Sequence, residues 1–118
     1  MNTSNKINWF VAAVGVWEIL APLILGYSDL AVAVWNTVIV GIAVVVLAVW
    51  SALSDNPSTV RALDWINAIL GGWLIIAPFI LGYSTFTVAA LWNPIIAGII
   101  IAVLEVWAGL SVRSVEVT

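Results

Sequence analysis

The sequence predicts an all-α membrane protein with four transmembrane helices, arranged as two parallel-repeat helical hairpins. Three observations lead to this prediction. Hydrophobic residues make up 64% of the 118 residues and charged residues only 8%, whereas soluble domains typically carry about 25% charged residues. The few charges separate long apolar segments, and the second half of the chain repeats the residue pattern of the first.

The limits of the expected spans follow from the positions of charges and turn residues. A helix needs about 20 apolar residues to cross the hydrocarbon core of a bilayer. The expected spans cover residues 9–25, 32–53, 65–81 and 88–110. Strands are excluded, because an open sheet would leave its edge amides unpaired in lipid. Four strands are also too few to close a membrane barrel, which needs about 8.

We expect a single transmembrane domain over residues 1–118. It divides into a first repeat at about 9–53, a cytoplasmic linker at 54–64, a second repeat at about 65–110, and a short C-terminal tail at 111–118. The linker is polar and contains Pro57, which is typical of a surface loop with a helix restarting near Ser58 or Thr59. The N-terminal run imitates a cleavable leader, but the same run recurs later in the chain, so we interpret it as a span.

The orientation follows from the three basic residues, Lys6, Arg61 and Arg113. With four spans, all three fall on one side of the membrane. The positive-inside rule then places both termini in the cytoplasm. Tryptophans at or near the predicted span ends indicate an interfacial belt; these are Trp9, Trp35, Trp50, Trp65, Trp92 and Trp107.

The repeat covers nearly the whole chain. Gly15-Val16-Trp17 matches Gly71-Gly72-Trp73, residues 21–28 match 77–84, and Trp35-Asn36 matches Trp92-Asn93 after a one-residue insertion. Each unit has two spans, so both units enter the membrane from the same side. Such parallel repeats are related by an axis along the membrane normal.

This pattern of Gly-x-Trp, small-Pro, Leu-Gly-Tyr and Trp-Asn-x-x-x-x-Gly resembles the SPW repeat family of small prokaryotic membrane proteins. The Ser-Pro-Trp tripeptide itself is replaced by Ala21-Pro22-Leu23 and Ala77-Pro78-Phe79, so only its proline is kept. The resemblance implies a four-helix protein of a bacterial or archaeal cytoplasmic membrane. It implies no reaction.

Repeated prolines and glycines are candidates for helix ends and helix packing. Pro22 and Pro78, followed by Gly26 and Gly82, are interpreted as kinks or early helix ends that lead into tight turns. The alternative is that the freed carbonyl groups line a polar site. Small residues in the spans predict close helix packing, within a repeat, between repeats or with another subunit; these are Gly15, Gly41, Gly71, Gly72 and Gly98.

Four polar residues form a candidate intramembrane site. Glu18 and Glu105 are the only ionisable residues inside the predicted spans, and a charge there costs at least ~2.5–3.5 kcal/mol on insertion scales. They break the repeat, because Glu18 aligns with Leu74 and Glu105 with Ala48. Asn36 and Asn93 fit helix N-caps or interhelical hydrogen bonds, with ligand contact as the alternative.

Several functional classes are excluded or disfavoured by composition. Cysteine and histidine are absent, which removes thiolate chemistry and the commonest metal ligand and general base. We find no nucleophile–base pair, phosphate-binding loop or basic cluster, so we expect neither an enzyme nor a nucleic-acid-binding protein. No metal or cofactor is predicted, and lipid contacts are expected.

Three functional hypotheses therefore stay open. The first is a structural or accessory membrane protein that packs as a homo-oligomer or within a larger complex. The second is a small proton or cation transporter or channel that uses Glu18 and Glu105. The third is a pigment- or quinone-binding subunit, because eight tryptophans could line such a site. The sequence favours the first, because it shows no reactive constellation.

Overall fold

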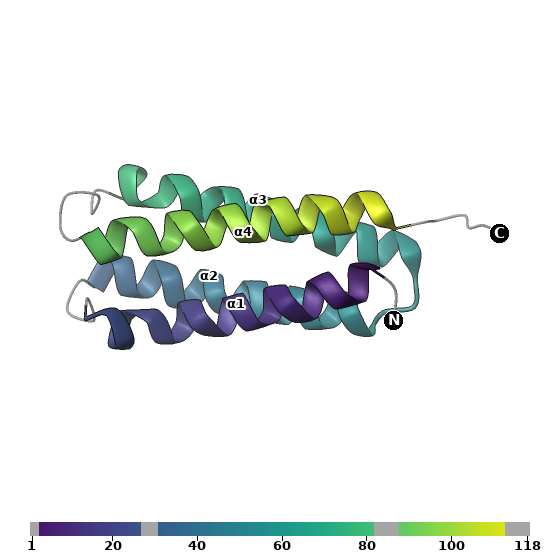
Figure 1. Ribbon diagram of the computed structural model, residues 1–118, viewed down its shortest axis with the longest axis horizontal. Helices are drawn as coiled ribbons and strands as arrows, with labels where there is room; N and C mark the ends of the chain where they lie inside the picture. Colours follow the sequence, from purple (N-terminus) through teal and green to yellow (C-terminus); the bar gives the residue numbers. More distant parts are fainter. Residues whose placement is uncertain (1–2, 27–30, 82–87, 113–118) are drawn as a thin grey trace.

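The computed structural model describes residues 3–26, 31–81 and 88–112, and this part of the chain forms four α-helices. They are α1 (Thr3–Leu25), α2 (Ala31–Leu53), α3 (Pro57–Ile80) and α4 (Val88–Ser111). Figure 1 shows them side by side in one elongated bundle. Each is long and apolar enough to cross a membrane. The predicted all-α membrane fold is confirmed, and the protein is a multi-pass membrane protein.

The start of α1, the end of α4 and the α2–α3 connection lie at one end of the bundle (Figure 1). We call this the terminal end. Lys6 and Arg61 both lie near it, and Arg61 Nη2 donates to the carbonyl oxygen of Val112 at 3.1 Å. Arg113, the third basic residue, lies outside the described residues, so its expected location at this end stays a prediction.

Helix α3 begins eight residues earlier than the predicted span, so the linker is shorter than expected. Asn56 is its N-cap, and the Asn56 side-chain oxygen accepts hydrogen bonds from Ser58 N at 2.9 Å and Thr59 N at 3.4 Å. Pro57 occupies the first turn, where its missing N–H costs nothing. The prediction ended the linker at Asp64 because that residue is charged, but Asp64 lies inside α3 and is fully buried.

The prolines lie near the helix ends, as predicted, but they do not end the helices. Pro22 and Pro78 are inside α1 and α3, and both are buried. Gly26 directly follows α1 with a φ of 84°, a left-handed conformation that glycine adopts readily. Its counterpart Gly82 lies outside the described residues.

Glycines bring the two helices of each hairpin into close contact. A Cβ on Gly41 would lie 2.9 Å from the carbonyl oxygen of Gly15, and one on Gly98 would lie 2.5 Å from that of Gly71. No side chain larger than hydrogen fits without movement, so these four positions set the helix separation. The fifth glycine, Gly72, differs, because a Cβ there meets nothing within 4 Å.

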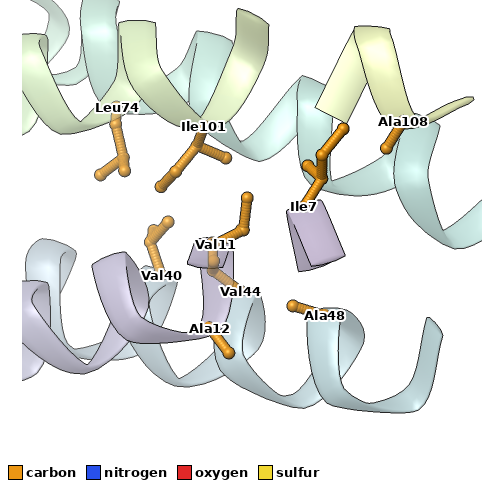
Figure 2. Packing of buried hydrophobic residues seen from close by; sticks show 9 residues of the cluster. All are labelled: Ile7, Val11, Ala12, Val40, Val44, Ala48, Leu74, Ile101 and Ala108. Carbon is orange, nitrogen blue, oxygen red and sulfur yellow. The ribbon is translucent and has the colours of Figure 1, made fainter. Parts of the chain in front are cut away.

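The hairpins pack on each other through an apolar layer. It consists of Val11, Val40, Val44, Leu74 and Ile101, of which all but Val40 are 0% exposed. Figure 2 shows Leu74 and Ile101 pointing toward Val11 and Val40 across the interface between the hairpins.

The outer surface of the bundle is apolar. Large side chains such as Leu23, Ile69 and Leu110 are at least 70% exposed, as expected where lipid is the solvent. The predicted belt tryptophans are also on this surface, 39–64% exposed; these are Trp9, Trp35, Trp50, Trp65, Trp92 and Trp107.

Candidate functional site

A network of hydrogen bonds surrounds Asp64 in the terminal half of the bundle. Asp64 Oδ1 accepts from Ser51 Oγ at 2.7 Å and from Asn8 Nδ2 at 2.9 Å, and Oδ2 accepts from Ser4 Oγ at 3.0 Å. All four side chains are at most 4% exposed. Since the donors come from α1 and α2 and the acceptor from α3, the network connects the two hairpins.

Glu105 on α4 lies close to this network. Asn67 Nδ2 donates to Glu105 Oε2 at 3.0 Å and to the carbonyl oxygen of Val44 at 3.2 Å. Asn67 follows Asp64 by one helical turn on α3, and the carboxyl groups of Asp64 and Glu105 are near enough to interact electrostatically. We call the whole group the terminal-end zone; it comprises Ser4, Asn8, Ser51, Asp64, Asn67 and Glu105.

The terminal-end zone contains more acceptors than its donors satisfy. Asn8 Oδ1, Asn67 Oδ1 and Glu105 Oε1 are buried and have no hydrogen-bond partner within the described chain. Buried polar atoms are nearly always paired, so these three oxygens are the places in the zone where a proton, a water or an ion can bind.

Glu18 lies in the other half of the bundle, beside Asn93. Its side chain is 0% exposed, and by geometric criteria neither carboxyl oxygen has a hydrogen-bond partner among the described residues. The Asn93 side chain lies close enough to interact with the carboxyl group. Pro22 cannot donate to the Glu18 carbonyl group four residues back, so the local backbone is polar as well.

The apolar layer lies between Glu18 and the terminal-end zone. On α1, Val11 lies between Asn8 and Glu18, which are ten residues and about 15 Å apart along the helix. On α4, Ile101 likewise lies between Asn93 and Glu105. The interior of the bundle therefore contains polar side chains on both sides of the apolar layer.

Two crossed hydrogen bonds join the hairpins in the Glu18 half. Trp17 Nε1 donates to Asn93 Oδ1 at 2.8 Å, and Trp73 Nε1 donates to Asn36 Oδ1 at 2.8 Å. Each bond connects a tryptophan of one hairpin to an asparagine of the other, at equivalent positions of the repeat. Because Asn36 and Asn93 lie well inside α2 and α4, the N-cap interpretation is wrong and the interhelical one applies.

A cavity of about 950 Å³ opens at the terminal end. Ser4, Lys6, Trp9 and Val60 are among the residues that line it. Ser4 also donates to Asp64. The cavity therefore leads from the surface to the edge of the terminal-end zone.

Comparison with known protein families gives a match to the SPW repeat domain over residues 5–108. This covers most of the 118 residues. The chain belongs to the SPW repeat family. Comparison with curated proteins and with solved structures finds no match. Membership in the SPW repeat family agrees with the resemblance seen in the sequence and indicates a small membrane protein.

In this SPW repeat protein, the sequence-predicted polar residues do not form one site. Glu105 lies in the terminal-end zone, Glu18 and Asn93 lie beyond the apolar layer, and Asn36 lies in the second Trp–Asn pair. Glu18 and Glu105 are the only ionisable residues within the predicted spans, but the helices begin earlier than those spans, so α1 also contains Lys6 and α3 also contains Arg61 and Asp64.

The residues that sequence reasoning missed share one helix face with those it found. Ser4, Asn8, Val11, Gly15 and Glu18 follow a 4-3-4-3 spacing on α1, and residues 60, 64, 67, 71 and 74 follow it on α3. This spacing places them on one side of a helix. Extending the repeat toward both helix starts from the glycines would have found Asn8, Asp64 and Asn67.

Proposed function

We propose that this protein moves protons or small monovalent cations across the membrane, with Glu18 and Glu105 binding the ion on opposite sides of the apolar layer. The observation that carries the proposal is Glu18, a fully buried carboxyl group with no hydrogen bond from the described chain. An ionisable side chain inside a membrane is costly, and its usual use is in an ion or proton path.

The hairpins supply the moving part for this function. Glycine contacts hold α1 against α2 and α3 against α4, while the chain itself joins the hairpins only through residues 54–56. The hydrogen bonds between the hairpins would rearrange in the movement. In the structure described here the apolar layer closes the path. We propose that a rocking of one hairpin against the other hydrates this layer, as in transporters built from repeats.

Flux measurements on proteoliposomes test this function. We expect the purified protein to pass H⁺, Na⁺ or K⁺ under a membrane potential, and Glu18→Gln to reduce that flux at least tenfold, because the amide keeps the shape but cannot bind or release a proton. Glu18→Asp keeps the carboxyl group and should retain a measurable part of the flux. Absence of flux in the unchanged protein, or equal flux in Glu18→Gln, would contradict the proposal.

The terminal end is proposed to face the cytoplasm of a bacterial or archaeal cell, because Lys6 and Arg61 lie there. The chain contains no cysteine, so labelling of a single introduced cysteine shows which side of the membrane that position faces. In Asp55→Cys, an impermeant maleimide should label inverted vesicles and leave intact cells unlabelled. The reverse pattern would overturn this orientation.

A second candidate function is that of an accessory subunit or homo-oligomer, and Gly72 favours it. This glycine has open space around it and lies among exposed apolar side chains of α3, such as Ile69 and Ile76. Gly72→Leu should leave the isolated bundle stable but remove a partner or second copy that co-purifies in mild detergent. If nothing co-purifies with the unchanged protein, this candidate fails.

A further inference from the structure

The terminal-end zone is an unusual concentration of buried oxygen atoms. Beside the Asp64 carboxylate it contains Glu105 Oε1, Asn8 Oδ1 and Asn67 Oδ1, each without a hydrogen bond from the described residues. The hydroxyl groups of Ser4 and Ser51 add two more oxygens. All these side chains are at most 4% exposed.

The donors of the zone are already used. Asn8 Nδ2 donates to Asp64, and it also lies within hydrogen-bond distance of Ser51 Oγ. Asn67 Nδ2 donates to Glu105 and to the carbonyl of Val44. Of the described basic side chains, Lys6 lines the cavity and Arg61 donates to Val112. Neither bonds to the three unpaired oxygens, so these are open to a cation from outside the described residues.

A metal cation can contact several of these oxygens at once, whereas a single proton satisfies only one. Carboxylate and amide oxygens are hard ligands that favour hard cations. The ligand set has two carboxyl groups and two neutral amide oxygens, and the described residues contain no group of three or more acidic, histidine or cysteine side chains that could hold a metal ion. The two carboxyl groups interact electrostatically and therefore resist ionising together. One negative charge beside neutral oxygens suits one positive charge better than two.

We propose that the terminal-end zone binds a sodium ion. The ligands are the Asp64 and Glu105 carboxyl groups and the side-chain oxygens of Asn8 and Asn67, and the cavity beside Ser4 provides the entry. A role for this site in transport rests on the proposed function, but binding itself does not require Glu18. Sodium would also connect the hairpins, because its ligands come from α1, α3 and α4.

Thermal unfolding of the purified protein in detergent tests the site. At constant ionic strength, NaCl should raise the melting temperature in a saturable way, while choline chloride should not. Asp64→Asn keeps an acceptor for the serines but removes the charge, and Glu105→Gln keeps the Asn67 contact. Each should weaken the apparent sodium affinity at least tenfold. Broadening of the ²³Na NMR signal by the protein gives a second readout if a variant folds poorly.

Trp73→Phe is the control, because Trp73 bonds to Asn36 beyond the apolar layer and has no part in either proposed ion site. It should keep the full sodium effect. A melting temperature equally raised by choline, or unaffected by sodium, would overturn the sodium site even if flux is observed. A sodium effect without flux in the unchanged protein would instead overturn the proposed transport and leave the site standing.

Discussion

The two hairpins share their packing residues but differ in their buried polar groups. Gly15 and Gly41 contact each other as Gly71 and Gly98 do, and the two Trp–Asn bonds have equal lengths of 2.8 Å. The polar positions do not match. Several buried polar residues align with apolar ones, among them Glu18 with Leu74, Asn67 with Val11, Glu105 with Ala48, Ser51 with Ala108, and Ser4 with Val60.

This difference separates residues that build the bundle from residues that give it a chemical role. A duplicated hairpin needs equivalent contacts in both copies, so shared residues are explained by packing. A buried carboxyl group in one copy only is not needed for that packing, because the other copy folds without it. The comparison can be tested by substitutions at shared and at unshared positions.

The largest effect is expected at the shared glycines. Gly98→Val should destabilise the bundle by about 3 kcal/mol, because its Cβ would meet the backbone oxygen of Gly71 at 2.5 Å. Gly41→Val should cost less, since the same contact is 2.9 Å. Gly72→Val, with no atom nearby, is the matched control. Unfolding free energies in mixed micelles measure the three losses of stability. A loss for Gly72→Val as large as that for Gly98→Val would contradict the expected order.

A smaller effect should follow when the aligned pair Asn8 and Asp64 is exchanged. If the hairpins were interchangeable, Asn8→Asp with Asp64→Asn would be neutral. We expect a loss of about 2 kcal/mol, because the carboxylate at position 8 would face the carbonyl oxygen of Ser4, to which Asn8 Nδ2 now donates at 2.9 Å. Adding Val60→Ser and Ala108→Ser at the aligned positions should recover part of it. A neutral exchange would show that both hairpins accept the carboxylate equally well.

The smallest effect is expected at the crossed tryptophans. Trp17→Phe and Trp73→Phe each remove one indole donor and should cost about 1 kcal/mol. The two costs should be equal, because the bonds are equivalent. A clear difference in unfolding free energy between the variants would show that the asymmetric polar residues also change the shared contacts.

The fold was predictable because lipid imposes a strong and local constraint. Apolar length, the charge positions and the repeat identified the four helices, and the glycines of each hairpin were recognised as packing positions. Glu18 and Glu105 were found because a buried acid departs from that constraint. Asp64 was missed because charge alone was taken to exclude it from a span, although serine and asparagine donors stabilise it there.

The pairing of polar residues could not be predicted from one sequence. Asp64 meets Asn8 at a distance of 56 residues, and Trp17 meets Asn93 at 76. Such contacts depend on which faces of the two hairpins pack together, and both hairpins present similar small and apolar residues to their neighbours. The helix register gives the face of each residue, but only the packed bundle gives its partner.

The polar bonds between the hairpins have a consequence for biogenesis. During synthesis the first hairpin enters the bilayer before Asp64 and Asn93 have been made, so Asn8, Ser51 and Trp17 then lack the partners that they have in the finished protein. The first hairpin alone is therefore less stable in the bilayer than the complete bundle, and insertion of the second hairpin is the step that stabilises the chain.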